Sequence, residues 1–416
     1  MFSLICYDTA INSRGRSMKK LKSIFKPGSS FLPFILSVLS MGLAYGLYKG
    51  VIDNYLAEIV TMGEFERGVA EFFRELPGLA LIFILAALFM LSAEAMYKIG
   101  AVVMLVGMAL HYIVPPTQVM ITVAICVYSL GEHIQLGMKN TIALEYSAPG
   151  RGGEALGIHN SASQIGTLAG YIAIIAAFTV IPATTGNYKL FFLISAAIMA
   201  VGAFFSFRLR GSSRTDKSRS RFYFRRKFTK YYFLEVFYGA RKQVFLTFGP
   251  YVLILFYGAD TATISLLFAI SAICCFIAAP LVGKLIDRVG YKVIMVSDTL
   301  ILVIVCFFYG FSHRLFSMDT AFIVCCVNYV LDSIISLASM ASNVYVQDIS
   351  DSPEEVRATI STGISVNHMI TILIALFGGW VWKTLGIETL FILSAVLGLA
   401  NSAYAATIKG KGFVNG

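Results

Sequence analysis

The sequence predicts an all-α membrane protein of twelve transmembrane helices, and three observations support this fold class. Hydrophobic residues make up 57% of the 416 residues, whereas soluble domains contain roughly 45–50%. Charged residues make up only 13%. The apolar runs are long and continuous, as in residues 264–282, and do not alternate with period two. This pattern indicates spanning helices and excludes a transmembrane barrel.

Apolar runs with the length of a spanning helix, about 20 residues, occur twelve times along the chain. Charged residues interrupt the first, second, fourth, seventh and tenth runs, so hydropathy alone ranks these five lower. In chain order, the predicted spans are residues 31–58, 68–92, 97–114, 117–143, 156–182, 188–208, 230–257, 262–285, 291–312, 318–346, 357–384 and 387–408.

Basic residues predict the orientation of the helices. Lys and Arg are frequent before the first span and after the sixth, and such clusters mark the cytoplasmic side. We therefore expect both termini in the cytoplasm and four basic residues outside: Arg67, Lys189, Arg314 and Lys383. The net charge of +10 then reflects topology, and we expect no nucleic-acid partner. The chain has no Asn-x-Ser/Thr sequon, which fits a bacterial inner-membrane protein.

The basic, serine-rich stretch after the sixth span divides the chain into two six-helix halves. Each half would form one helical bundle, and the stretch between them would be a cytoplasmic linker. The predicted parts are an N-terminal tail (1–30), an N-terminal bundle (31–208), the linker (209–229), a C-terminal bundle (230–408) and a C-terminal tail (409–416).

A short motif lies between the eighth and ninth predicted spans, at residues 283–292. It resembles the G-x-x-x-D-R-x-G-[RK]-[RK] cytoplasmic loop of the major facilitator superfamily, with Tyr291 at the first position of the final basic pair. Glycines permit a tight turn, and an acidic residue can cap a neighbouring helix. The predicted cytoplasmic gate motif is Gly283, Asp287, Arg288, Gly290 and Lys292.

The resemblance implies a fold and a function. Major facilitators contain two pseudo-symmetric six-helix bundles and work by alternating access. We therefore expect a monomeric secondary transporter in the lipid bilayer, with a small-molecule substrate, a coupling proton as a further candidate partner, and no cofactor. The corresponding motif in the first half, at residues 93–100, is degenerate.

Internal symmetry selects candidate site residues on the helices that line the central cavity in this family. The first and seventh spans share a tyrosine followed four residues later by a lysine, and the fourth and tenth share a mid-span acid. Charges at this depth persist where they face a watery cavity or one another. The predicted substrate-binding residues are Tyr45, Lys49, Tyr238, Arg241 and Lys242, and the predicted coupling acids are Glu132 and Asp332. The peripheral helices lack mid-span charges except for Asp298.

The second span contains four charged residues, Arg67, Glu71, Arg74 and Glu75. Their spacing places them on one helical face. One interpretation is a solvated extension outside the membrane. The other is an outer cavity wall formed by Arg74 and Glu75, with Glu71 as a third coupling acid.

Several other residue patterns point to packing. His133, His159 and His368 each stand alone on an apolar helix, where a hydrogen-bonded packing role is more common than a site. The seven cysteines show no metal-binding spacing, so we predict no metal site. The sequence also has no P-loop and no nucleophile–base arrangement, so we expect neither an ATP-driven pump nor an enzyme with catalytic residues.

Three functions remain open at this stage. A transporter of a polar, anionic or zwitterionic solute fits best, because Lys49 and Lys242 would hold an anion between the halves, as in the organic-anion branch that the chain resembles. A multidrug or metabolite efflux pump would favour a less charged cavity. A membrane sensor that does not transport would need a regulatory domain, and the sequence shows none.

Overall fold

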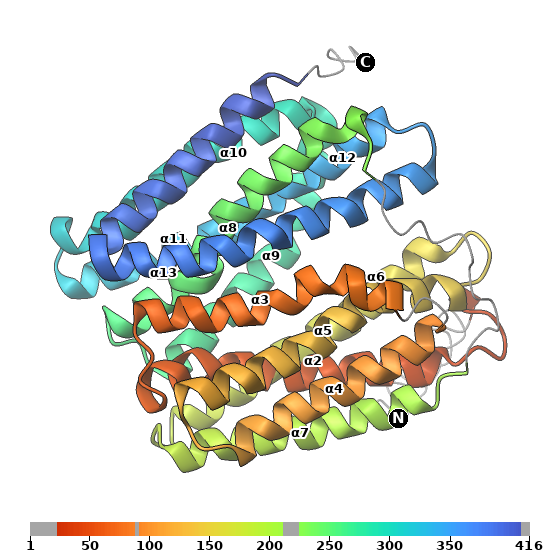
Figure 1. Cartoon of the computed structure of the whole chain (residues 1–416), viewed down its shortest axis with the longest axis horizontal. Helices are drawn as coiled ribbons and strands as arrows, with labels where there is room; N and C mark the ends of the chain where they lie inside the picture. Colours follow the sequence, from red (N-terminus) through yellow and green to blue (C-terminus); the bar gives the residue numbers. More distant parts are fainter. Residues whose placement is uncertain (1–22, 88–90, 211–223, 409–416) are drawn as a thin grey trace, which may run out of the picture.

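The computed structural model describes residues 23–87, 91–210 and 224–408, and these residues are almost entirely helical (Figure 1). The predicted tails and linker therefore lie largely outside the described residues. Within them, the helices form twelve membrane-length segments, six on each side of the linker. The predicted all-α membrane fold is confirmed.

The six segments before the linker begin and end close to the predicted spans. Three of them begin at a Ser or Thr whose side chain accepts a hydrogen bond from a backbone N–H in the first turn, as N-cap residues do. The helices are α2 (Phe31–Asn54), continued by η1 (Tyr55–Ile59), α3 (Glu64–Ala87), α4 (Ala93–Ile113), α5 (Gln118–Tyr146), α6 (Gly152–Phe178) and α7 (Thr185–Phe207).

The segments after the linker include one broken and one bent helix. The helices are η2 (Arg226–Phe228), α8 (Thr229–Leu255), α9 (Thr261–Val289), α10 (Tyr291–Leu315), α11 (Met318–Ile335), η3 (Ser336–Ser339), α12 (Met340–Ile349) and α13 (Pro353–Ala406). The predicted tenth span is thus α11 and α12 joined by a 3₁₀ turn. The chain reverses within α13 at Gly386, where φ is 89°, a backbone conformation that favours glycine; α13 therefore contains the eleventh and twelfth segments.

Apolarity alone identifies most of these segments. Among the described residues, nine helical stretches are long and apolar enough to cross a membrane, and the last of them is α13 with its two segments. The two segments that fail this test are α3 and α8, because both contain several charged residues. The first, fourth and tenth segments pass despite their charges.

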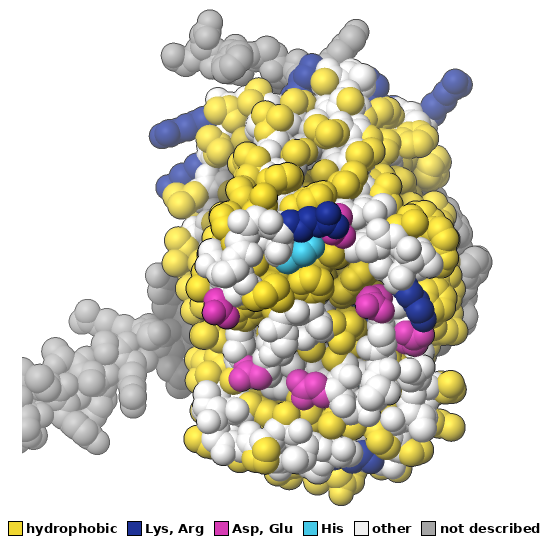
Figure 2. All heavy atoms as spheres, turned by 90° about the vertical axis from the view of Figure 1, so that its left-hand side faces the viewer, with side chains coloured by type: hydrophobic (Ala, Val, Ile, Leu, Met, Phe, Trp, Pro, Cys, Tyr) yellow, Lys and Arg dark blue, Asp and Glu magenta, His cyan; other side chains and the backbone are white. Residues whose placement is uncertain are grey.

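The two halves lie one above the other in Figure 1, with α8 to α13 in the upper layer and α2 to α7 in the lower one. They meet where α3 packs on α13 and α6 packs on α9. We call the end of the molecule that contains residues 210 and 224 the linker side, and the opposite end the far side. Figure 2 looks onto the far side, where the few charged side chains are scattered among apolar and neutral ones.

The far side is the end at which the halves are closed against each other. Asn54 donates to the Ala259 carbonyl at 2.9 Å, and the Tyr251 hydroxyl donates to the Met62 carbonyl at 2.6 Å. The remaining hydrogen bonds between described residues of the two halves lie at the far side or at mid-membrane. The described part of the structure is therefore closed at the far side.

Glycines allow α2 and α6 to pack backbone to backbone within the first half. Gly42 and Gly46 of α2 face Gly166 and Gly170 of α6, a small-xxx-small arrangement typical of membrane helix pairs. An added Cβ at Gly170 would lie 2.6 Å from the Leu47 backbone nitrogen. A side chain there must push the two helices apart.

Replacing Gly170 with leucine should therefore lower the stability of the protein by about 1–3 kcal/mol, the usual cost of overpacking. Thermal unfolding of the purified protein in detergent would measure the effect. Gly157→Leu on the same helix is the control, because an added Cβ there meets nothing within 4 Å. Equal melting temperatures for the two variants would contradict this account of the helix contact.

Candidate functional site

A cavity of about 110 Å³ lies among α2, α3 and α5, with Leu246 of α8 closing one wall. Tyr45, Tyr48 and Tyr128 contribute aromatic surface to it. Its wall also contains six charged side chains from the first half: Lys49, Asp53, Arg67, Glu71, Arg74 and Glu132. This is an unusual concentration of charge for the interior of a membrane protein.

Ion pairs connect five of these charges in a continuous chain. Asp53 accepts from Lys49 at 2.6 Å and from Arg67 at 3.2 Å. Glu71 lies between two guanidinium groups, at 2.9 Å from Arg67 and 2.7 Å from Arg74. Spacings of three and four residues place Lys49 and Asp53 on one face of α2 and the other three charges on one face of α3.

The chain of ion pairs continues into the second half of the molecule. Arg74 also pairs with Glu75, whose second carboxylate oxygen lies 2.8 Å from Nδ1 of His368 on α13. Gln243 of α8 donates to Glu71 at 2.8 Å. With Glu75 included, three cations and three anions balance, which offsets much of the cost of burying charge. This network joins α2, α3, α8 and α13.

Comparison with known proteins agrees with this architecture. The model of the Major Facilitator Superfamily matches residues 231–409, which is the second half of the chain. Among solved structures, the nucleoside transporter NupG superposes with a TM-score of 0.69 at 18% identity, covering 91% of this chain and 99% of that one. The family match is confined to the second half of the chain, and the whole chain shares the fold of this transporter.

Two further facilitator structures share the fold. A D-xylose-proton symporter has a TM-score of 0.69 at 14% identity, covering 90% of this chain and 96% of that one. A POT family transporter in complex with 5-aminolevulinic acid has a TM-score of 0.70 at 12% identity, covering 89% and 94%. No curated protein matches the chain in sequence. Identities this low show the fold only.

The charged face of the second span lies in the interior of the helical bundle. Arg67, Glu71 and Glu75 are buried, and the side chain of Arg74 is 28% exposed at the cavity. The interpretation of a solvated extension is therefore wrong. Arg67 forms two ion pairs inside the bundle, in the first turn of α3, and its expected place on the outer side of the membrane stays a prediction.

The first-half candidates share one cavity. Tyr45, Lys49 and Glu132 all line the cavity. The Lys49 ammonium also lies 4.9 Å from the ring centre of Phe268 on α9, so it contacts both halves. Glu132 is half-buried near the middle of α5 and has no ion pair among the described residues. It is the one charged group of the cavity wall outside the network.

The symmetry-related candidates of the second half do not share this cavity. Arg241 is fully buried, forms a 3.0 Å ion pair with Asp298 of α10, and stacks over the Tyr238 ring at 4.9 Å. The Tyr238 hydroxyl donates to the Ser336 carbonyl. The expectation that Arg241 and Tyr238 line the substrate cavity is therefore corrected. Their surroundings form a separate small pocket, which Asp298, the exception among the peripheral helices, also lines.

Asp332 is also outside the cavity wall, contrary to expectation. It is buried in the second half, and its Oδ1 atom has no hydrogen-bond partner among the described residues. Lys242 is half-buried, and no ion pair connects it to another described residue. It precedes Leu246, a cavity residue, by one helical turn, so both residues lie on the same face of α8.

The gate motif forms the last turn of α9 and a one-residue turn at Gly290, where φ is 85°. Asp287 and Arg288 are exposed, Lys292 is half-buried, and an added Cβ at Gly283 would meet nothing within 4 Å. No side chain caps the start of α10, the following helix, and the capping of another neighbouring helix by Asp287 stays a prediction. Tyr291, at the position that departs from the family pattern, donates to Asp348 of α12 at 3.1 Å.

Proposed function

We propose that this protein is a secondary transporter that moves a small polar solute, zwitterionic or anionic, across the bacterial inner membrane by alternating access. The observation that carries the proposal is the charged cavity beside the interface between the halves. Six charged side chains in its wall suit a polar cargo better than the amphipathic compounds of an efflux pump.

The balance of charge favours a zwitterionic solute. Lys49, Arg67 and Arg74 already have acidic partners, so the cavity has no net excess of positive charge. Glu132 from the first half and Lys242 from the second have no ion pair among the described residues. A solute with an ammonium group and a carboxylate or phosphate would satisfy both, and it would connect the halves while bound.

The basic residues indicate how the protein is oriented in the membrane. Basic residues are frequent in the linker and next to it, namely Arg208, Arg210, Arg225, Arg226 and Lys227, and this enrichment is typical of the cytoplasmic side. We therefore place the linker side in the cytoplasm, with both termini, and infer that the described conformation is closed to the outside. Glu132 is the candidate for binding a coupling proton, because it is the carboxylate in the cavity wall that has no ion pair among the described residues.

Replacing Glu132 with glutamine should lower the solute accumulation driven by a proton gradient at least tenfold, while counterflow exchange of the solute persists. The reason is that the amide keeps the shape of the side chain but cannot carry the proton. The measurement is uptake of labelled amino acids, organic phosphates and sugars into proteoliposomes, with and without a pH gradient. Glu154→Gln is the control, since Glu154 is an exposed residue paired with Arg151.

Lysine variants test the charge of the solute in the same assay. Lys49→Gln and Lys242→Gln should each weaken binding of a zwitterion or an anion, with folded protein retained. Normal binding in both variants, or a solute that proves to be a simple cation, would refute the proposed substrate class. Normal accumulation by Glu132→Gln would leave transport intact as a function but remove Glu132 from coupling.

A further inference from the structure

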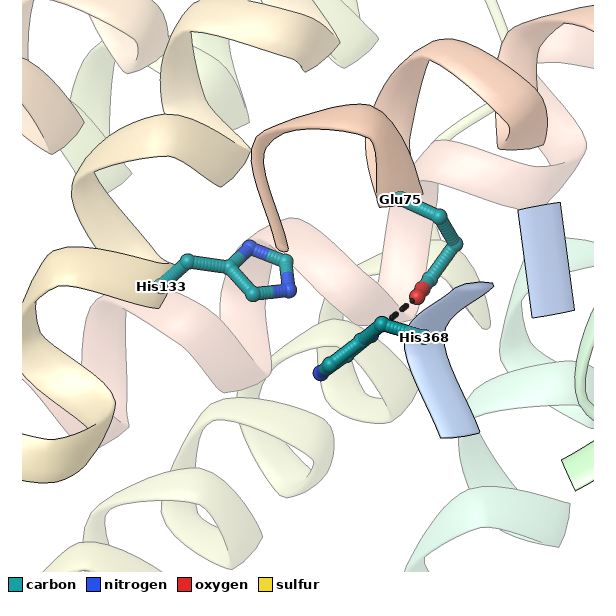
Figure 3. Close-up of side chains that lie close together, drawn as sticks. All are labelled: Glu75, His133 and His368. Atoms are coloured by element: carbon teal, nitrogen blue, oxygen red, sulfur yellow. Dashed lines mark hydrogen bonds and ion pairs between the residues drawn. The ribbon is translucent and has the colours of Figure 1, made fainter. Parts of the chain in front are cut away.

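Three potential metal ligands converge beside the network, at the boundary between the two halves. They are Glu75 of α3, His133 of α5 and His368 of α13, and one ligand atom of each lies within 4.8 Å of the others. Figure 3 shows both imidazole rings and the carboxylate directed toward a common centre. The three residues are far apart in the sequence, and the fold alone brings them together.

The tautomer of His133 leaves a metal-binding nitrogen toward this centre. Nδ1 of His133 lies 2.8 Å from the Ser129 carbonyl oxygen, which can only accept, so Nδ1 carries the proton. Nε2 is then unprotonated, and it has no hydrogen-bond partner among the described residues. An imidazole held by a backbone carbonyl through its other nitrogen is the usual arrangement of a metal-binding histidine.

Glu75 is held in a similar way from outside the cluster. Its Oε1 atom accepts from Arg74, while Oε2 accepts from the Thr371 hydroxyl at 3.2 Å and lies 2.8 Å from Nδ1 of His368. Arg74 therefore occupies one carboxylate oxygen and leaves the other facing both histidines. The side chain of His368 is 19% exposed, so the cluster is not sealed from solvent.

A glycine leaves open the space next to both imidazoles. A Cβ added at Gly78 would lie 2.7 Å from Nε2 of His133 and 3.0 Å from Nδ1 of His368. Any other residue at this position would put a methyl or methylene group between the two nitrogens. The absence of a side chain at Gly78 thus allows the two histidines to approach each other.

We propose that Glu75, His133 and His368 bind a divalent transition-metal cation, with Zn²⁺ as the best match, and that the ion bridges the two halves of the molecule. Two imidazoles and one carboxylate are a common zinc ligand set, with a fourth position left for water. Bonds of about 2.1 Å require the ligand atoms to move closer by rotation of the side chains. The ion replaces the proton now shared by Glu75 and His368.

This proposal revises the expectation of no metal site, and it does not depend on the proposed solute. The ion would link α3 and α5 of the first half to α13 of the second. Because alternating access requires the halves to move relative to each other, a bound ion would restrain that motion. Binding would also weaken in acid, since the ligand nitrogens must be unprotonated.

The test is calorimetric titration of Zn²⁺ into the full chain, purified with a tag that contains no histidine. We expect one Zn²⁺ per chain, and a Kd weakened at least tenfold by His133→Ala, His368→Ala or Glu75→Gln. Gly78→Ala should weaken binding similarly, although it keeps all three ligands. His313→Ala is the control, because His313 lies near the far side beside Glu388 and should leave Kd unchanged.

Two results would overturn the proposal. One is wild-type binding no tighter than that of the His133→Ala, His368→Ala double variant. The other is tight binding that all four variants retain, which would place the ion elsewhere. Since a variant can also lose binding by misfolding, Co²⁺ absorption serves as a second measurement: visible bands of a four-coordinate ion should appear with the wild type and His313→Ala but not with folded Gly78→Ala.

Discussion

Replacing Arg241 with leucine is expected to destabilise the protein by about 3–5 kcal/mol, the cost of leaving a buried charge without its partner. Arg241 has no exposed surface, and its ion pair with Asp298 is buried in the second half. Removing the guanidinium leaves Thr299 as the one residue in the described part of the chain that donates a hydrogen bond to the Asp298 carboxylate. Thermal unfolding in detergent, compared with the wild type, would show the loss.

A double variant separates the ion pair from simple packing. Arg241→Leu combined with Asp298→Leu should recover most of the lost stability, because replacing a whole buried pair by apolar residues is often neutral. The Nε and Nη1 atoms of Arg241 have no partner among the described residues, which favours this outcome. Lys242→Leu, next in the chain but without an ion pair, is the control and should change stability little. A double variant as unstable as Arg241→Leu would contradict the argument.

The sequence predicts the membrane segments well because their cause is local. Apolar length decides whether a segment crosses a bilayer, and this property can be read from consecutive residues. The charges that lower the hydropathy of the second segment, α3, form most of the interior network, whereas Arg241 in the seventh segment, α8, forms a separate ion pair with Asp298. The cytoplasmic linker stays a prediction, since most of its residues lie outside the described ranges.

Of the candidates that internal symmetry selects, only those of the first half line the cavity. Equivalent sequence positions fix the depth of a residue in the membrane but not the direction of its side chain. Arg241 and Lys242 differ by about 100° around α8, and only the packing of α10 decides that Arg241 turns toward Asp298. Asp298 was visible in the sequence as the one mid-span charge on a peripheral helix, and pairing it with Arg241 would have avoided the error.

The histidine cluster could not be predicted at all. His133 and His368 each look like packing residues in sequence, and Glu75 looks like part of a charged helical face. Their convergence depends on the close approach of α3, α5 and α13, which Gly78 permits. A long-range contact of this kind leaves no periodic signal in a single sequence.

Replacing Gly379 with tryptophan is expected to prevent closure of the far side and to lower transport at least tenfold. Gly379 of α13 faces Gly68 of α3, and an added Cβ at Gly379 would lie 2.8 Å from the Glu64 carbonyl oxygen. Backbone meets backbone at this point, so a large side chain cannot be accommodated while the halves are together. Because alternating access requires this end to close in turn with the linker side, the variant should remain open at the far side.

Cysteine accessibility measures this change without knowledge of the solute. Thr261 is buried between the halves, where its hydroxyl lies 2.6 Å from that of Tyr188, so a cysteine placed there should react slowly with a membrane-impermeant thiol reagent. Gly379→Trp should raise its rate of labelling from the far side severalfold, in a background without the native cysteines. Gly157→Trp is the control, since a Cβ at Gly157 meets nothing within 4 Å. An unchanged labelling rate together with normal transport would mean that the contact between Gly68 and Gly379 does not control access to the cavity from the far side.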